Sequence, residues 1–202
     1  MIIERSSVFL KLLYGKALFR KDPGDHSVYL TFDDGPIPDI TPWVLDTLDR
    51  YGAKATFFLV GDNVRKYPDI FRMVTERGHK VGNHTFNHLR GLWVRTPDYV
   101  DNVDKCNGYF ESRLFRPPHG MMHLWVYNYI KGYYDIVFHD LVTRDYSKYL
   151  TPGEVVHNVK KYTRNGSIIV FHDSLRSWHN LEKALPESIE WLQSQGYAFK
   201  TL

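Results

Sequence analysis

Two adjacent carboxylates and two spaced histidines are the residues of this 202-residue chain whose types and positions best suit chemistry. Asp33 and Asp34 follow one another in the motif TFDDGP at residues 31–36, and His84 and His88 bracket the motif HTFNH. The spacing of four predicts that both imidazoles lie on one side of a helical turn, close enough to share a cation. With Asp34 as a third ligand, the site would have two histidines, one carboxylate and open positions, as catalytic zinc and iron sites have.

Each of these features also has an ordinary structural explanation. Asp-Gly-Pro clusters are common turn material, and one histidine pair is a weak signal in a chain with ten histidines. The motif RPPHG at residues 116–120 is stiff and would hold the guanidinium of Arg116 where it could orient a carboxylate, although it also suits a rigid surface loop. His172 follows an apolar stretch and precedes Asp173, a position that also suits a buried core histidine.

Composition limits the other possibilities. Cys106 is the only cysteine, which excludes an internal disulfide and a cysteine-rich zinc site, so any metal must be held by histidine and carboxylate. The net charge of +3 is too small to indicate a nucleic-acid or membrane partner. With 43% hydrophobic residues, the chain can bury a full core. We expect one domain over residues 1–202, with the motifs in residues 27–202 and an N-terminal extension over residues 1–26.

The N-terminus carries no recognisable targeting signal. Apolar residues run from Val8 to Leu13, but Lys11 interrupts them and no small-residue cleavage pattern follows. No stretch approaches the roughly 20 apolar residues that a membrane span needs. The default expectation is therefore a cytoplasmic protein, although exported proteins can also lack disulfides, and the oligomeric state is not predicted.

Short apolar runs alternate with amphipathic segments, which predicts parallel βαβ units. Seven strands are expected, at Ser27–Phe32, Ala55–Val60, His79–Gly82, Leu114–Arg116, Tyr134–His139, Ser167–Phe171 and Tyr197–Thr201. They would form either a closed barrel or a doubly wound open sheet. Six helices are expected between them, and three should be capped by the threonines of Thr41-Pro42, Thr96-Pro97 and Thr151-Pro152.

This layout places the chemical residues at the carboxyl ends of the strands, where ligands bind in barrels and in open parallel sheets. Asp33 and Asp34 follow the first predicted strand and the two histidines follow the third. The fourth, fifth and sixth strands are followed by Arg116 to His119, by Asp140 and Asp145, and by His172 and Asp173. Five loops therefore converge on one end of the molecule.

The order and spacing of these motifs resemble those of the polysaccharide deacetylase family, which is carbohydrate esterase family four and includes nodulation chitooligosaccharide deacetylases. TFDDGP matches the first motif of the family and HTFNH the second, and the similarity extends from about Ser27 to the C-terminus. The resemblance implies a distorted (β/α)7 barrel that is an incomplete TIM barrel. It also implies a single divalent metal ion, with Zn²⁺ preferred and Co²⁺ or other divalent ions as alternatives.

The resemblance further implies a role for each motif residue. Asp33 would be the general base, held in place by Arg116. Asp34, His84 and His88 would be the metal ligands, and the backbone N–H of His119 would stabilise the oxyanion. His172 would be the general acid that protonates the departing amine, and Asp145 would keep it protonated, with Asp173 as the alternative partner. The motifs place expected substrate contacts at Pro118, Tyr146 and Val170, and we expect a fourth contact at Trp178 from its position after His172.

Three positions depart from the family pattern. His119 stands where the third motif usually has tyrosine, Tyr146 stands where the fourth motif usually has tryptophan, and Val170 replaces leucine. These changes affect the expected substrate more than the expected reaction. Trp93 and Trp178 lie near the same loops and would suit sugar faces, although a tryptophan there covers the core equally well.

The leading hypothesis is therefore metal-dependent removal of acetate from N-acetylglucosamine units of an oligosaccharide or cell-wall-type glycan. One alternative keeps the site but changes the substrate to a small non-sugar amide. Another is a glycan-binding homologue that has lost turnover, although neither Asp33 nor His172 is missing.

Overall fold

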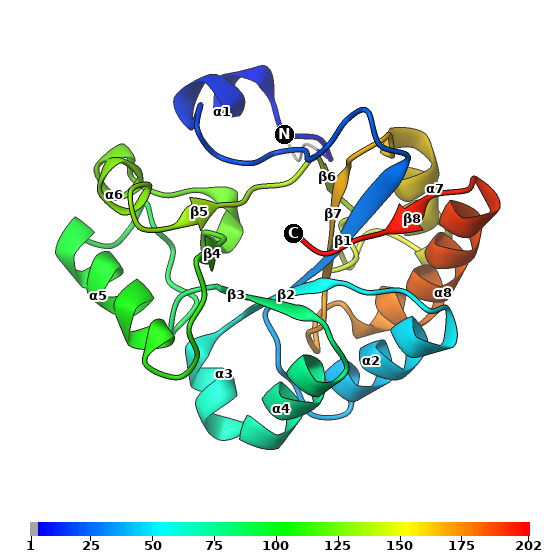
Figure 1. The fold of residues 1–202 in the computed structure, drawn as a ribbon, viewed down its shortest axis with the longest axis horizontal. Coiled ribbons are helices and arrows are strands. Elements are labelled where there is room, and N and C mark those ends of the chain that lie inside the picture. The colour runs from blue at the N-terminus through cyan, green and yellow to red at the C-terminus, as the bar shows by residue number, and fades with distance from the viewer. Residues whose placement is uncertain (1–3) are drawn as a thin grey trace.

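The computed structural model describes residues 4–202, and its centre is a curled parallel sheet surrounded by helices (Figure 1). The strand order is β5-β4-β3-β2-β1-β7-β6, and β8 pairs with the beginning of β1. The strands are β1 Ser27–Asp33, β2 Thr56–Leu59, β3 Lys80–Asn83, β4 Leu114–Phe115, β5 Asp135–Ile136, β6 Leu141–Val142, β7 Ile168–His172 and β8 Ala198–Phe199. The path of seven strands confirms the expected distorted (β/α)7 barrel.

The seven strands along the barrel differ from the seven predicted strands by one exchange, because β6 is present and β8 lies outside the path. The predicted strand Tyr134–His139 is regular only in β5, and the chain then forms β6, which the sequence analysis missed. β5 pairs with β4 whereas β6 pairs with β7, so one short stretch of chain joins the two edges of the barrel. A two-residue strand has no periodicity to detect. The predicted strand Tyr197–Thr201 contains β8, which lies outside the path of seven.

The helices lie around the outside of the sheet. They are α1 Val8–Leu13, α2 Ile40–Arg50, α3 Gly61–Lys66, α4 Pro68–Glu76, α5 Thr96–Asn107, α6 Leu124–Ile130, α7 Pro152–Tyr162 and α8 Trp178–Ser194, with a 3₁₀ turn η1 at Pro118–Gly120. Thr151 caps α7 in a complete capping box with Glu154, as predicted. Thr41 and Thr96 do not cap, because α2 begins one residue earlier, at Ile40, and α5 begins at Thr96 itself.

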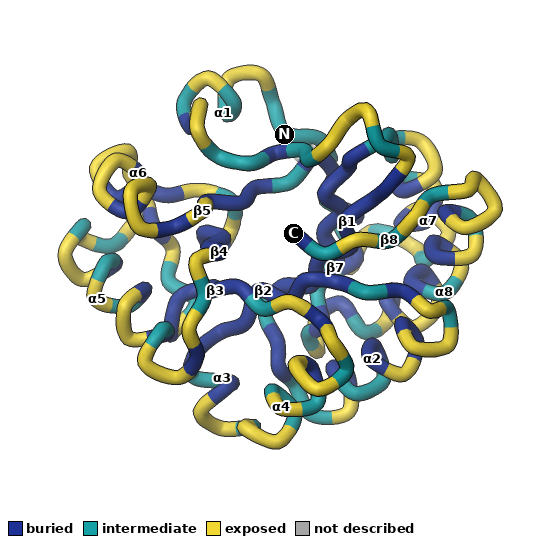
Figure 2. The backbone as a smooth tube through the Cα atoms, viewed as in Figure 1, coloured by how far each residue is buried: buried dark blue, intermediate teal, exposed yellow. Residues whose placement is uncertain are grey.

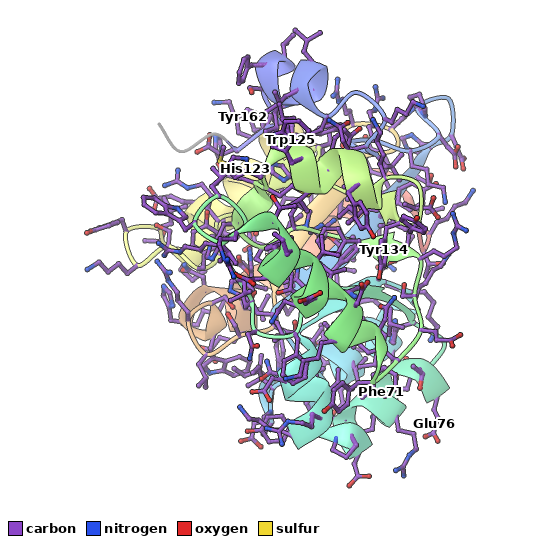
Figure 3. The ribbon with its side chains drawn as sticks, turned by 90° about the vertical axis from the view of Figure 1, so that its left-hand side faces the viewer. Phe71, Glu76, His123, Trp125, Tyr134 and Tyr162 are labelled. Carbon is purple, nitrogen blue, oxygen red and sulfur yellow. The ribbon has the colours of Figure 1, made fainter. Side chains whose placement is uncertain are left out.

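Hydrophobic side chains fill the inside of the barrel and the space under the helices. The strands are buried while the outer helix faces are exposed (Figure 2). The inner cluster comprises Tyr29, Phe58, Leu114, Val137, Ile168 and Leu202. A larger cluster lies beneath α2, α7 and α8, and a third packs α5 and α6 against the barrel, on the side seen in Figure 3. Successive strand residues therefore alternate between the inside and the helices, as in a buried parallel sheet.

The N-terminal extension is part of the barrel wall. Leu18 forms a parallel bridge with Val137, and Arg20 forms an antiparallel bridge with Ser167. Arg5 forms a further antiparallel bridge with Leu141. These bonds place the extension along the segment that joins β5 to β6. Among the described residues, no helix is long and apolar enough to cross a membrane.

Candidate active site

The two adjacent aspartates are separated by the backbone. Asp33 is the last residue of β1, and Asp34 takes a φ of 84°, a value that residues other than glycine rarely adopt. The side-chain amide of Asn63 donates a hydrogen bond to the carbonyl of Asp34 at 2.8 Å. The two carboxylates consequently meet different partners, and side chains that are neighbours in sequence can do different work.

Asp33 is held by a buried arginine. Nη1 of Arg116 lies 2.6 Å from Oδ1 of Asp33 and also donates to Oγ1 of Thr31. Nη2 donates to the carbonyl of Phe138, and the guanidinium lies 4.0 Å from the ring centroid of Phe58. The arginine thus binds Oδ1 through a charge-assisted hydrogen bond and leaves Oδ2 of Asp33 free of the arginine.

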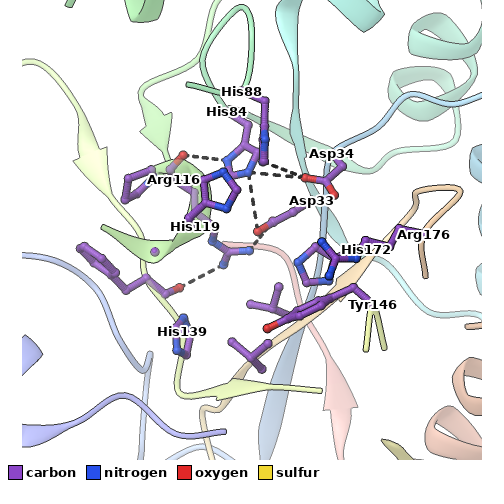
Figure 4. A pocket seen from close by; sticks show the side chains of 15 residues that line it. Asp33, Asp34, His84, His88, Arg116, His119, His139, Tyr146, His172 and Arg176 are labelled. Atoms are coloured by element: carbon purple, nitrogen blue, oxygen red, sulfur yellow. Dashed lines mark hydrogen bonds and ion pairs between the residues drawn. The ribbon is translucent and has the colours of Figure 1, made fainter. Parts of the chain in front are cut away.

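Asp34, His84 and His88 form a group whose ligand atoms lie within 4.8 Å of one another. Oδ1 of Asp34 lies 3.1 Å from Nε2 of His88 and 3.9 Å from Nε2 of His84 (Figure 4). Tetrahedral ligands at about 2.1 Å from a zinc ion are roughly 3.4 Å apart, so these separations suit one cation. The expected helical turn is wrong: Thr85 and His88 have positive φ values of 63° and 55°, and a loop brings the imidazoles together.

The protonation of this group also suits a metal. The Nδ1–H of His84 donates to the carbonyl of Arg116 at 2.7 Å, which leaves the lone pair of Nε2 available. Burial lowers the pKa of His84 to about 4, so the imidazole is neutral near pH 7. Burial opposes ionisation of Asp34, but the hydrogen bond from His88 and the nearby histidines hold its pKa well below its ordinary value. The neutral imidazole of His84, the imidazole of His88 and an ionised carboxylate are a suitable donor set for a divalent cation.

His172 stands on the opposite side of the cavity and is held by Asp145. Its Nδ1–H donates to Oδ1 of Asp145 at 2.8 Å, and its backbone N–H donates to Oδ2 at 2.7 Å. Burial alone would lower the pKa of His172, but the carboxylate of Asp145, with those of Asp34 and Asp33 farther off, raises it to about 9. The structure therefore presents a protonated imidazole whose Nε2 is not used by Asp145.

The carboxylate of Asp173 does not bind the imidazole of His172, although the sequence analysis kept it as an alternative partner. Its Oδ1 accepts the N–H of Gly35 at 3.2 Å, and its Oδ2 accepts the hydroxyl of Thr41 at 2.6 Å. A Cβ on Gly35 would lie 2.1 Å from Oδ2, so only glycine fits beside this carboxylate. Asp173 thus anchors the turn that follows Asp34.

Asp140 was also expected at this end of the barrel, but it lies elsewhere. Both of its oxygens bind the guanidinium of Arg164, and its Oδ2 accepts the hydroxyl of Ser167. It therefore takes no part in the cavity.

One cavity of about 360 Å³ collects most of the predicted residues. Its lining comprises Asp33, Asp34, His84, His88, Arg116, Pro117, His119, Gly120, Phe138, His139, Val142, Tyr146, Val170, His172 and Arg176. Figure 4 shows the ion pairs converging there. Asp145 is buried behind His172 and does not itself line the cavity. The position of His119 fits the expected oxyanion role, and the direction of its N–H stays a prediction.

Two of the four expected substrate contacts are placed differently. Tyr146 and Val170 line the cavity, and the Tyr146 ring meets that of His172 edge-on at 4.9 Å. Pro118 lines a neighbouring cavity instead. Trp178 lines none of the cavities described and packs edge-on against Trp43 at 5.0 Å, within the cluster under α2 and α8. This packing agrees with the core explanation of Trp178, and its contact with a sugar stays a prediction.

Among the cavity residues that the sequence analysis did not single out, two have side chains that can carry a charge, His139 and Arg176. His139 ends the stretch predicted as the fifth strand, two residues after the inward-facing Val137, so the alternation of that stretch already pointed it inward. Arg176 lies four residues after His172, and its guanidinium is 5.5 Å from the ring centroid of Tyr146. No sequence signal distinguishes Arg176 from an ordinary exposed arginine.

Comparisons with known proteins agree with this geometry. Residues 20–131 match the family model described as polysaccharide deacetylase. A peptidoglycan-N-acetylglucosamine deacetylase of Bacillus cereus is 34% identical over 184 residues, which are 87% of this chain and 85% of the relative. The solved structure of the Bc1960 peptidoglycan N-acetylglucosamine deacetylase superposes with a TM-score of 0.89 and 28% identity, over 98% of this chain and 95% of that one.

A third relative is informative because its activity was lost and regained. The structure of a mutant of BA3943, a CE4 family pseudoenzyme of Bacillus anthracis with restored enzymatic activity, superposes with a TM-score of 0.82 and 26% identity. The superposition covers 91% of this chain and 68% of the BA3943 mutant chain.

Because the family model matches more than half of the sequence, and a relative above 30% identity spans most of both chains, the chain belongs to the metal-dependent polysaccharide deacetylase family.

Proposed function

We propose that the chain hydrolyses the acetamide of N-acetylglucosamine units in a peptidoglycan-type glycan, releasing acetate and leaving a free amine on the sugar. The observation that carries the proposal is the cavity of about 360 Å³, which joins a carboxylate base, three metal ligands and a protonated imidazole. Relatives named as peptidoglycan-N-acetylglucosamine deacetylases support the choice of glycan.

Asp34, His84 and His88 would hold the metal, and we propose Zn²⁺ because its usual donors are neutral imidazole and carboxylate. When bound, such a cation supplies Lewis acidity, which polarises a carbonyl and lowers the pKa of water from 15.7 to about 7. The carbonyl of Arg116 fixes the ring of His84, so this ligand is oriented in advance.

Asp33 takes the proton from the attacking water at Oδ2, because its Oδ1 is engaged by Arg116. Arg116 itself is fixed by Thr31 and by the carbonyl of Phe138, so the carboxylate has little freedom to turn away. The chain thereby holds its base in one orientation at the end of β1.

His172 donates the proton that lets the nitrogen leave. Its Nδ1–H is bound to Asp145, so the proton must come from Nε2. The backbone N–H of His119 would receive the charge that develops on the acetyl oxygen. Val142 and Val170 provide apolar cavity wall suited to the acetyl methyl group.

Two isosteric variants test this division of labour. After loading with zinc, acetate release from N-acetylglucosamine oligomers should fall by roughly 10²–10⁴ in Asp33→Asn, while zinc affinity stays native. Asp34→Asn should lose both turnover and most of its zinc affinity, because it removes an anionic ligand. Native zinc affinity in Asp34→Asn would overturn the assignment of roles.

Substrate choice decides between the remaining possibilities. If the zinc-loaded native protein and Asp34→Asn are equally inert on several acetylated glycans, the sugar assignment is wrong. Hydrolysis of a small amide with none of any acetylated sugar would indicate an amidase. Tight sugar binding without acetate release at saturating metal would indicate a homologue that has lost turnover.

A further inference from the structure

A second cavity of about 190 Å³ adjoins the first at His119, which lines both. Its other lining residues are Arg90, Gly91, Leu92, Trp93, Pro118 and Met121. The ring of His119 also meets that of His88 at 4.7 Å, so the second cavity begins beside the metal ligands. None of its residues other than His119 takes part in the reaction proposed above.

The wall of this cavity is an exposed apolar surface. Trp93 is 83% exposed, and Leu92 and Met121 are each more than two-fifths exposed. Tryptophan is highly buried on average, so a ring this exposed beside a catalytic cavity is unusual. We call Leu92, Trp93, Pro118 and Met121 the Trp93 platform.

The backbone holds together the two segments that form the Trp93 platform, one with Leu92 and Trp93 and the other with Pro118 and Met121. Gly91 forms a parallel bridge with Met122, and a Cβ on Gly91 would lie 3.0 Å from the Met121 carbonyl oxygen and from Cα of Met122. A side chain at this position would press against that backbone, so glycine suits the close approach. The N–H of Trp93 donates to the carbonyl of Arg90 at 2.9 Å and closes a turn. The backbone that carries the Trp93 ring is therefore fixed by the bridge of Gly91 to Met122 and by the turn that Arg90 and Trp93 close.

We propose that the Trp93 platform binds the sugar that adjoins the deacetylated unit in the glycan chain. This inference rests on the proposed function, because it assigns a second subsite to the same substrate. A sugar presents a face of C–H groups that suits an aromatic ring, and the ring of tryptophan offers a large area with one polar N–H. Because His119 lines both cavities, they lie side by side, within reach of a single glycan chain.

The charge of the lining favours the same ligand class. Arg90 is the charged side chain of this cavity, and no carboxylate lines it. A guanidinium donates hydrogen bonds to hydroxyl and carboxylate oxygens, both of which glycans carry. A cationic partner would meet Arg90 without an acid to pair with. The Trp93 platform thus suits a neutral or acidic sugar better than a basic peptide.

The first experiment compares substrates of different length. The native zinc-loaded protein should have a higher kcat/KM on an N-acetylglucosamine pentamer than on the monosaccharide, and Trp93→Ala should reduce that ratio about tenfold, the equivalent of 1.4 kcal/mol. Trp125→Ala is the matched control, because Trp125 is 76% exposed on α6 and does not line either cavity (Figure 3). An unchanged ratio in Trp93→Ala, or an equal loss in Trp125→Ala, would overturn the proposal.

The second experiment separates this inference from the proposed function. Asp33→Asn should bind the pentamer without consuming it, so a dissociation constant can be measured by calorimetry. Adding Trp93→Ala to that background should weaken binding about tenfold. If the native protein releases no acetate but the platform substitution still weakens binding, the proposed function fails and the subsite stands. Equal binding by Asp33→Asn and by the double variant, or no binding by either, would contradict the proposed subsite.

Discussion

Two buried ion pairs face each other across the cavity, and they are built in opposite senses. On one side Arg116 and Asp33 both line the cavity, and the arginine binds one carboxylate oxygen and leaves the other free. On the other side Asp145 lies behind His172, so an imidazole faces it. Under the proposed function, the same attraction provides a base in one place and an acid in the other. Asp145 does not line the cavity, whereas Arg116 lines it with both terminal nitrogens bound to other groups of the protein.

A third buried carboxylate shows what happens without a cation. Asp173 receives only neutral hydrogen bonds, from Gly35 and Thr41. Burial, reinforced by the charge of Asp34, raises its pKa to about 8. Hydrogen bonding alone thus fails to hold this carboxyl in its usual range, whereas its neighbour in sequence, His172, is charged through its contact with Asp145.

The largest effect should follow from removing Arg116, the buried cation of the first ion pair. Arg116→Ala leaves the buried carboxylate of Asp33 without a partner, and breaking a buried pair in this way costs roughly 3–5 kcal/mol of stability. We expect a loss of that order in the free energy of unfolding by urea, together with loss of acetate release. Arg113→Ala is the control, since Arg113 pairs with Asp135 at 3.7 Å with both side chains exposed, and it should change little. Equal losses in the two variants would end the comparison.

Removing Asp145, the buried anion of the second ion pair, should have a smaller effect, visible in the pH dependence of kcat/KM. His172 must be protonated to act, so native activity should fall as the pH rises toward about 9, somewhat earlier when a cation offsets Asp34. Asp145→Asn removes the main charge that raises this pKa and should move the alkaline limb of kcat/KM to lower pH by roughly 1–3 units. An unmoved limb would show that Asp145 only positions the ring.

The same pKa predicts a change in stability. Because the folded pKa of His172, about 9, exceeds its ordinary value of 6.5, the stabilisation is complete below pH 6.5 and is lost as the pH rises through 9. In chelator-treated protein, native and Asp145→Asn should therefore differ most in unfolding free energy at the acid end of this window.

The smallest effect is expected at the carboxylate that lacks a cation. Asp173→Asn keeps the shape of the side chain and most of its hydrogen bonds, so activity should fall less than about tenfold. The folded pKa of about 8 lies above the ordinary 3.8, so the folded state retains a proton that the unfolded state loses, and native stability declines from pH 4 to pH 8. Chelator-treated Asp173→Asn should not show this decline. Parallel pH curves for the two proteins would mean that Asp173 is ionised like its neighbours.

Residues at strand ends were the most predictable part of the site. β1, β2 and β7 are long enough for their apolar runs to be recognised, and parallel strands necessarily bring their carboxyl ends together. The family motifs then assigned roles to residues that strand geometry could only gather. The placement of Asp33, His84 and His172 around one cavity followed from these two sources.

Loop conformation was the least predictable part. The spacing of four positions between His84 and His88 fits a helical turn. The positive φ of Thr85 shows that a loop brings the two imidazoles together instead. Thr41 precedes a proline as a cap would, but its hydroxyl binds Asp173, which lies 132 positions away. Trp178 was expected at a sugar, and the structure packs it on Trp43 at the start of an amphipathic helix. In the last two cases the partner that the side chain contacts is distant in sequence.

The bridges made by Leu18 and Arg20 have a consequence for how the chain folds. Their partners, Val137 and Ser167, are more than a hundred positions further along, so these contacts form late and carry a large loop-closure entropy. During synthesis, the early segment must wait until β7 has left the ribosome before it can take its place in the wall. Until then the apolar interior around Tyr29 stays open to water, and this interval is when aggregation or chaperone binding competes with folding.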